Sequence, residues 1–303
     1  MAEITAPTTN IQAPAVSRPQ FLKRLISIWR DDMTLSVQIS LIVLSLIVLL
    51  VVFADVIAPY DAGEMHMLNR LSPPVFTDGG TPDFLLGTDA IGRDILSRTL
   101  FGGRVSLMVG TISACISLAV GTVLGLLSGY LRGWVDWIIM YVVDVQLSLP
   151  FMLLAVAVAL VLGSNLVVLM GIAAFATFPY YTRVVRGAVL SLRHRDYVLA
   201  AEAAGASDLH IMVHHLLPGL IAPLLVLTTL NIGRIILLES GLSFLGIGVP
   251  PTIPTWGSMI EEGRDYLATA WWLAIIPGVT LMLLTMSIGT IGDWLRDVTD
   301  VNL

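Results

Sequence analysis

The chain contains few charged side chains and a single cysteine. Only 13% of its 303 residues are Asp, Glu, Lys or Arg, which is about half the share found in ordinary soluble domains. A chain so poor in charge cannot cover a globule with hydrated side chains, so the composition argues against a soluble enzyme. Cys115 has no second cysteine to pair with, and this excludes an internal disulfide framework.

Lysine is almost absent too. Lys23 is the only lysine and lies outside any Gly-Lys-Ser/Thr sequence, so the chain has no phosphate-binding loop of the Walker type. The 16 basic residues form no stripe, which argues against nucleic-acid binding. His210 and His214 are spaced i, i+4 without a carboxylate or cysteine cluster nearby, so we expect no metal site. No nucleophile is accompanied by a base and an orienting group, and we expect no catalytic residue.

Long apolar runs take the place of charge. Hydrophobic residues make up 56% of the chain, and a membrane-crossing helix needs about 20 of them in succession. The runs that meet or approach this length are 35–54, 105–131, 137–162, 165–182, 216–233 and 267–292. They are too long for barrel strands, and backbone polar groups cannot stay unpaired in hydrocarbon. The sequence therefore predicts an all-α polytopic membrane protein with six transmembrane helices.

The distribution of positive charge predicts the orientation. If the N-terminus is cytoplasmic, about twice as many Lys and Arg residues lie in inside segments as in outside segments. Both termini are then cytoplasmic, the external segments are about 55–104 and 239–266, and the large cytoplasmic loop is 183–215. The chain divides into an N-terminal tail (1–34), a first helix with an external loop (35–104), a transmembrane core (105–292) and a C-terminal tail (293–303). The polar, proline-containing residues 1–20 do not have the pattern of a cleavable signal peptide.

The cytoplasmic loop has the pattern of two short helices around a glycine. Ala and Leu dominate 197–204, and Gly205 ends that helix-forming run. Ser207 is placed to cap a second helix with Asp208 in its first turn. Helices this short are marginal in water, so we expect the loop to dock on a partner.

This loop resembles the coupling loop of bacterial ABC importer permeases. That pattern is Glu-Ala-Ala, three residues, Gly, nine residues, Ile-x-Leu-Pro, and here Gly205 and Pro218 fall in register. Leu199 replaces the usual Glu, His215 replaces the usual Ile, and Glu202 begins a copy of the triplet that is three residues out of register. The resemblance implies that the ATPase-coupling residues are Leu199, Ala200, Ala201, Glu202, Gly205, Ala206, Ser207, Asp208, Leu217 and Pro218.

Three further motifs narrow the resemblance. They are LLGTDAIGRDILSRTLFGGRVSL at 85–107, ESGLSFLGIGVPPTIPTWGSM at 239–259 and GDWLRD at 292–297. Together they resemble the C-type permease subunit of the dipeptide, oligopeptide and nickel ABC importers, over about residues 20–300. The resemblance implies a type I ABC importer permease fold with an external motif or gate formed by Gly87, Thr88, Asp89, Gly92, Arg93, Asp94, Leu242, Ser243, Phe244, Leu245 and Gly246.

The resemblance also implies a set of partners. The chain would be a non-catalytic subunit in the bacterial inner membrane, paired with a homologous B-type permease as a heterodimer. Two cytoplasmic ATPase subunits would bind ATP and magnesium, an extracytoplasmic solute-binding protein would deliver the solute, and this chain would bind no cofactor. Peptides are the leading substrates, with nickel, glutathione or another small solute as alternatives. A proton-coupled secondary transporter is the competing hypothesis, and it predicts transport without an ATPase.

The two external motifs permit local predictions. Thr88 or Asp89 is placed to cap a helix that reaches about Phe101, with Asp89 at its positive end. The closely spaced Gly and Pro residues of 242–257 predict irregular backbone. Such backbone suits either an outer gate or an ordinary external loop.

Ionisable residues interrupt two of the predicted spans. Asp144 lies in the third, and Arg234 and Glu239 extend the fifth toward its outer end. Charges in these places are costly and face a cavity or a partner. We interpret all three as possible pathway-lining residues. For Arg234 the alternatives are contact with a substrate carboxylate, an internal ion pair, or a pairing with the sister subunit.

Overall fold

The computed structural model describes residues 33–250 and 252–300. This part of the chain is helical and contains no β-strand, and an isolated bridge joins Thr88 and Asp94. The predicted N-terminal tail lies almost wholly outside the described residues. The helices are α2 (Leu35–Val52), α3 (Ala54–Ile57), the 3₁₀ turn η1 (Met67–Asn69), α4 (Ile95–Leu131), α5 (Gly133–Ser148), α6 (Phe151–Leu162), α7 (Leu166–Leu192), α8 (Asp196–Ala203), α9 (Asp208–His210), the π-helical turn η2 (Ile211–Leu216), α10 (Leu217–Phe244), α11 (Trp256–Arg264) and α12 (Trp272–Asp300).

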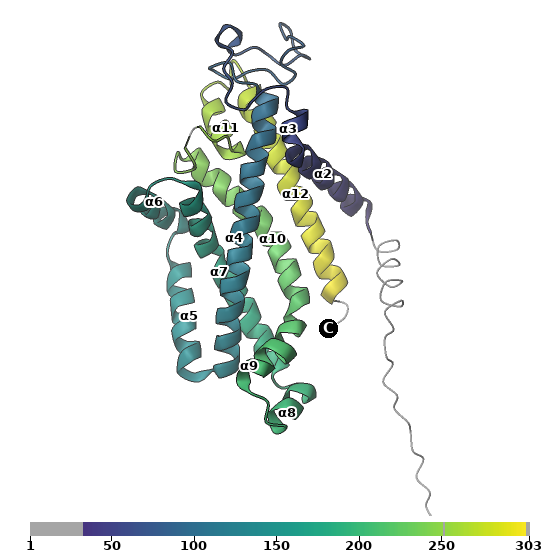
Figure 1. The fold of residues 1–303 in the computed structure, drawn as a ribbon, viewed down its shortest axis with the longest axis vertical. Coiled ribbons are helices and arrows are strands. Elements are labelled where there is room, and N and C mark those ends of the chain that lie inside the picture. Colours follow the sequence, from purple (N-terminus) through teal and green to yellow (C-terminus); the bar gives the residue numbers. More distant parts are fainter. Residues whose placement is uncertain (1–32, 251, 301–303) are drawn as a thin grey trace, which may run out of the picture.

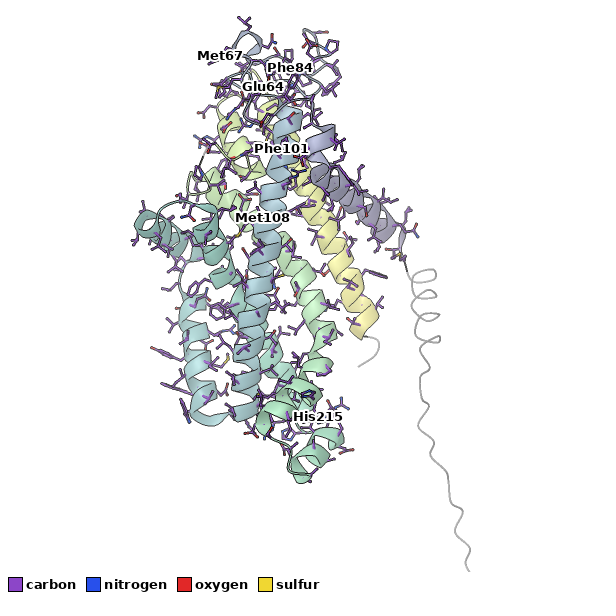
Figure 2. The ribbon with its side chains drawn as sticks, in the orientation of Figure 1. Glu64, Met67, Phe84, Phe101, Met108 and His215 are labelled. Atoms are coloured by element: carbon purple, nitrogen blue, oxygen red, sulfur yellow. The ribbon has the colours of Figure 1, made fainter. Side chains whose placement is uncertain are left out.

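The long helices form one elongated bundle (Figure 1). Figure 1 shows α4, α7, α10 and α12 running along the bundle, with α8 and α9 at one end. The opposite end holds α11 and the segment between α3 and α4. We call this end the cap and define it as residues 58–94 and 245–271. Figure 2 shows the same division, with Glu64, Met67 and Phe84 in the cap and His215 at the other end.

The predicted number of spans agrees with the helices. Five described helices are long and apolar enough to cross a membrane: α2, α4, α7, the continuous stretch Asp208–Phe244 and α12. A sixth crossing results if α5 and α6 together count as one span. The all-α polytopic prediction is therefore confirmed.

The third predicted span, 137–162, is not a single straight helix. It consists of α5 and α6, which meet at an angle of 92°. The break falls at Leu149, which has an extended backbone with ψ of 135°. Pro150 follows, and the ring of a proline disfavours helical backbone in the residue before it. The mostly apolar residues on both sides of Pro150 concealed this break.

Several helices extend beyond the apolar runs that predicted them. α4 begins at Ile95, ten residues before the predicted boundary at 105, and its 37 residues span roughly 55 Å. A bilayer core is only about 30 Å thick, so part of α4 projects beyond it. α10 runs on through Arg234 and Glu239 to Phe244. A charged residue therefore ended the apolar pattern without ending the helix.

The most extensive helix contact in the described chain joins α4 to α7. Glycines spaced i, i+4 along α4 lie against large side chains of α7, as their small size predicted. An added Cβ at Gly125 would lie 2.6 Å from the Cβ of Val185, and one at Gly129 would lie 2.8 Å from the Cβ of Val189. The same approach occurs between Gly121 and Tyr181. Close approach of the two backbones therefore depends on these positions having no side chain.

Cys115 lies on a different side of α4. The small residues next to it in the sequence suggest that it fills space inside the bundle, but the structure shows Cys115 exposed.

Candidate functional site

The turn between α8 and α9 has the predicted glycine geometry. Gly205 has φ of +78°, in the left-handed region that glycine adopts without strain. Its N–H donates to the carbonyl oxygen of Glu202 at 3.0 Å, and the N–H of Ala206 donates to that of Ala201 at 3.1 Å. This pair of hydrogen bonds is a Schellman motif. Gly205 is thus the residue that ends α8 and turns the chain.

The second helix starts as predicted. Ser207 is its N-cap, and the Ser207 hydroxyl accepts a hydrogen bond from the backbone N–H of His210. Asp208 lies in the first turn, where a carboxylate complements the positive end of a helix.

The second helix does not end before the next span. α9 continues through the wider turn η2 into α10, so Leu217 and Pro218 lie in the first turn of α10 and not in a loop. Pro218 has no N–H to donate to the preceding turn, which gives a physical reason for irregular helix geometry just before it. α9, η2 and α10 therefore form one continuous helical rod.

This segment, residues 193–218, is called the coupling segment below. It is fixed to the end of α4, because the Tyr130 hydroxyl donates to Asp208 at 3.0 Å and the Arg193 guanidinium donates to the Tyr130 carbonyl at 3.1 Å. Val198 of α8 is fully buried against this end of the bundle. Leu199 and Leu209 point the other way and are 46% and 68% exposed. The segment is thus held on one side and presents apolar side chains on the other.

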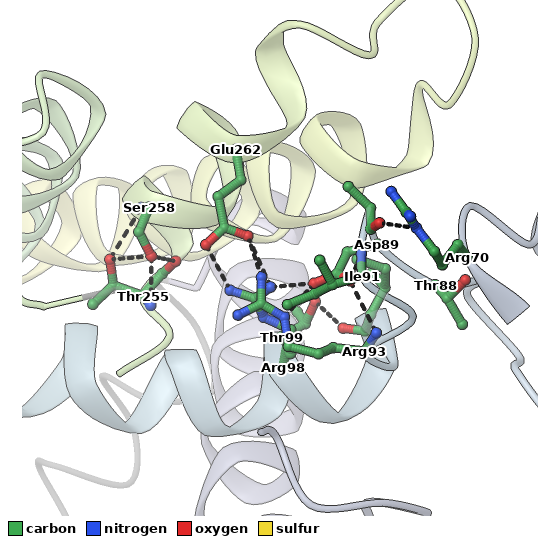
Figure 3. Close-up of polar contacts among 12 residues, drawn as sticks. Arg70, Thr88, Asp89, Ile91, Arg93, Arg98, Thr99, Thr255, Ser258 and Glu262 are labelled. Carbon is green, nitrogen blue, oxygen red and sulfur yellow. Dashed lines mark hydrogen bonds and ion pairs between the residues drawn. The ribbon is translucent and has the colours of Figure 1, made fainter. Parts of the chain in front are cut away.

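The cap contains a second group of predicted residues, drawn in Figure 3. Arg98 of α4 is buried between two carboxylates, Asp89 and Glu262 of α11. Its guanidinium donates to both carboxylate oxygens of Glu262, at 2.8 and 3.0 Å. Arg93 contacts the same two acids, at 2.5 Å from Asp89 and 2.8 Å from Glu262. These ion pairs join the segment before α4 to the helix after α10.

The sequence predicted that Thr88 or Asp89 caps a helix, and this prediction is wrong. The chain makes a tight turn from Thr88 to Asp94 through Gly92, which has φ of +85°, and α4 begins only at Ile95. Asp94 is the cap and accepts from the backbone N–H of Ser97 at 2.7 Å. The helix cap therefore lies five residues after Asp89 and six after Thr88.

The two aspartates differ in their electrostatics. Burial raises the pKa of Asp89, but the Arg93 backbone N–H and the charges of Arg98 and Arg93 outweigh it and hold that pKa below its ordinary value. Burial raises the pKa of Asp94 above its ordinary value, although Ser97 donates hydrogen bonds to it. Asp89 is therefore the carboxylate held firmly in its charged form.

The glycines of the first external motif allow close backbone contact inside the cap. A Cβ at Gly87 would lie 2.6 Å from the carbonyl oxygen of Ser72, and a Cβ at Gly92 would collide with the carbonyl of His66. Thr88 accepts from the N–H of Ser72 at 2.9 Å, and Trp272 donates to the Thr88 carbonyl at 3.1 Å. The motif thus holds the cap together.

The second external motif is helical in its first half. Leu242, Ser243 and Phe244 form the last turn of α10, and Leu245 is its C-cap. Irregular backbone covers the described residues 245–250, with Gly246 at φ of +74°, and 252–254, and Thr255 then caps α11. The prediction of irregular backbone over 242–257 was therefore wrong for its first three positions, which end α10, and for its last two, Trp256 and Gly257, which begin α11.

The three ionisable residues of the predicted spans have different surroundings. Glu239 is fully buried and accepts from Ser243 at 2.7 Å and from Ser106 at 3.1 Å. Asp144 is exposed and pairs with Arg183 of α7 at 2.6 Å. Arg234 is exposed, and its guanidinium lies 4.6 Å from the centre of the Tyr180 ring. Glu239 thus lies inside the helix contacts, while Asp144 and Arg234 reach the surface.

The ion pair between Arg186 and Asp136, which joins α7 to α5, was not predicted from the sequence. Arg186 of α7 donates to both oxygens of Asp136 in α5, at 2.5 and 2.7 Å. The two residues are 50 positions apart in the chain. A pairing over that distance leaves no local sequence signal, so it required the fold.

The described residues form a bundle of helices long enough to span a membrane, with a helical projection at one end, an architecture that membrane transport permeases have. Residues 121–300 match the family described as binding-protein-dependent transport system inner membrane component, and the chain belongs to this family. Residues 37–74 match the N-terminal transmembrane domain of oligopeptide transport permease C.

Two relatives and one solved structure illustrate the similarity. The chain is 43% identical over 264 residues to the di/tripeptide transport system permease protein DppC of Pseudomonas aeruginosa, which covers 87% of each chain. It is 40% identical over 265 residues to the dipeptide transport system permease protein DppC of Haemophilus influenzae, which covers 88% of this chain and 90% of the relative. A chain of the MetNI methionine ABC transporter, solved in inward-facing conformations, gives a TM-score of 0.54 at 20% identity, over 67% of this chain and 95% of that one. This last likeness concerns the fold.

The chain is therefore a multi-pass permease subunit of a bacterial ABC importer of the inner membrane. Permease subunits of this family are non-catalytic and work with ATPase partners. These findings favour the importer hypothesis over a proton-coupled secondary transporter or a membrane enzyme.

Proposed function

We propose that this chain is the C-type permease of a peptide importer and forms the translocation pathway together with a homologous B-type permease. The observation that carries the proposal is the 43% identity, over 87% of both chains, to a relative named for di- and tripeptides. The other relative described above is named for dipeptides. The transported solute is accordingly a dipeptide or short oligopeptide.

The coupling segment is the part that contacts the two ATPase subunits. Its exposed Leu199 and Leu209 supply apolar contact area. Because α9, η2 and α10 follow one another without a break, displacement of α9 by a closing ATPase moves α10 as well. ATP and magnesium bind to those ATPases, and this chain contributes no ligand to them.

The coupling segment is cytoplasmic and the cap is external, with both termini in the cytoplasm. The excess of Lys and Arg in the segments that the sequence assigns to the cytoplasm supports this orientation. The cap is then the surface on which an extracytoplasmic solute-binding protein delivers the peptide.

The test is to reconstitute the chain with its B-type permease, its ATPases and its binding protein in proteoliposomes. We expect uptake of a labelled dipeptide that requires ATP on the side of the ATPases and the binding protein on the other side. Uptake driven by a proton gradient without the ATPases would contradict the proposed mechanism. Uptake of nickel ions or glutathione, with no uptake of dipeptides or short oligopeptides, would contradict the proposed substrate class.

A further inference from the structure

Arg234 of α10 differs in its partners from the arginines of α4 and α7, two long helices that pack against α10. The arginines of α4 and α7 all meet a carboxylate of this chain; the pairs are Arg98 with Asp89 and Glu262, Arg104 with Asp55, Arg183 with Asp144, and Arg186 with Asp136. Arg234 has no carboxylate within ion-pair distance among residues 33–250 and 252–300, and no hydrogen-bond acceptor there either. Among the described residues, its guanidinium makes a cation–π contact with the Tyr180 ring.

The lack of a carboxylate partner is unusual for an arginine at the position of Arg234. It lies within α10, roughly 15 Å along the helix from the cap end at Phe244. Buried residues flank it at Gly233 and Ile235, but Arg234 itself is exposed on the surface of the chain. A guanidinium at this depth is strongly disfavoured against lipid, and such groups face a water-filled cavity or a partner. In the assembled transporter Arg234 therefore faces a water-filled space or a partner subunit.

The contact with Tyr180 leaves Arg234 free to bind an anion reversibly. The aromatic face stabilises the cation without a fixed negative charge. A guanidinium over a ring also keeps its in-plane N–H donors free for bidentate contact with a carboxylate. A pathway site must attract its solute and still release it, and an arginine with no permanent counter-ion meets both requirements.

We propose that Arg234, oriented by Tyr180, binds the C-terminal carboxylate of the peptide as it passes through the membrane. This inference rests on the proposed function, because every linear peptide with a free C-terminus carries that carboxylate. Arg234 is then a specificity-determining residue within the permease, in addition to the selection made by the binding protein.

The experiment compares two labelled peptides, L-alanyl-L-alanine and L-alanyl-L-alaninamide, which differ in the C-terminal negative charge. The complete reconstituted complex is used, with both peptides at concentrations that saturate the binding protein. The wild type is compared with Arg234→Gln, Arg234→Lys and Tyr180→Leu. The same binding protein serves every variant, so its own preference cancels between them.

We expect Arg234→Gln to reduce the ratio of acid uptake to amide uptake by about tenfold or more, the scale of a lost hydrogen-bonded charge contact. Arg234→Lys keeps the charge and should retain part of the preference. Tyr180→Leu removes the ring face that orients the guanidinium and should lower the ratio in the same direction as Arg234→Gln.

Three results would decide against the proposal or its basis. An unchanged ratio in Arg234→Gln, in a complex that imports the free dipeptide, would overturn the role of Arg234 and leave the peptide function intact. Lower recovery and lower thermal stability of the Arg234→Gln complex at an unchanged ratio would assign Arg234 to an ion pair with the partner permease. Absence of any peptide uptake by the wild type would refute the proposed function, and this inference with it.

Discussion

Gly205 combines a left-handed backbone with open space around it. Its φ is +78°, and an added Cβ would meet no atom within 4 Å. A side chain at this position therefore costs conformational energy and causes no collision. The penalty for an L-residue in this region is roughly 1–2 kcal/mol, and β-branched residues tolerate it least.

We predict that Gly205→Val uncouples the transporter while its helices still insert. Straining the Schellman turn tilts α8 away from α9, which weakens association with the ATPases and abolishes uptake. The measurements are complex recovery and peptide uptake, with membrane insertion checked by the amount of chain in the membrane. Gly205→Asn is the matched control, because Asn visits left-handed backbone more readily. Normal uptake by Gly205→Val at normal expression would contradict a role for this turn in coupling.

At the scale of single residues, sequence reasoning succeeded where the partners are near in the chain. The Gly205 turn and the Ser207 cap involve residues within five positions of each other. It failed for Arg98 and Glu262, which are 164 positions apart, and for Asp136 and Arg186. Such pairs exist only after the helices have packed.

At the scale of elements, the contact between α4 and α7 depends on missing side chains. Small residues spaced i, i+4 permit a close helix approach, and the structure identifies α7 as the neighbour of Gly121, Gly125 and Gly129. The break between α5 and α6 was harder to predict, because the residues on both sides of Pro150 are mostly apolar. Composition indicates burial in a membrane but carries no information on helix direction.

We predict that Gly125→Val destabilises the helix pair. The new Cβ would lie 2.6 Å from that of Val185, so the helices must separate. Overpacking of this kind costs about 1–3 kcal/mol, which should lower the thermal midpoint of the purified complex. Gly171→Val in α7 is the control, because a Cβ there meets nothing within 4 Å. Equal midpoints for the two variants would contradict this account of the contact.

At the scale of the whole molecule, the coupling segment and the cap lie at opposite ends of the bundle (Figure 1). Ser207 and Asp78 are exposed at these two ends. If the proposed orientation holds, a membrane-impermeant thiol reagent reaches them from opposite sides of the membrane.

We predict that a cysteine at Asp78 is labelled in intact spheroplasts, while a cysteine at Ser207 is labelled only after the membrane is opened. Both variants are made in a Cys115→Ala background, because Cys115 is itself exposed. Wild-type protein and the background variant serve as controls for labelling at residue 115. Labelling of Ser207→Cys from outside would reverse the topology.

The ion pairs of the cap also set an order of events during biosynthesis. Arg98 is buried against Glu262, which is made 164 residues later. At about 5–20 residues per second the ribosome needs roughly 10–30 s to cover that distance. During this interval Asp89 is present to pair with Arg98 and Arg93, and Glu262 is still missing. The ion pairs of the cap are completed only after α10 has crossed the membrane and α11 has been made. A chain that stops before α11 therefore holds two cap arginines with a single acidic partner, Asp89.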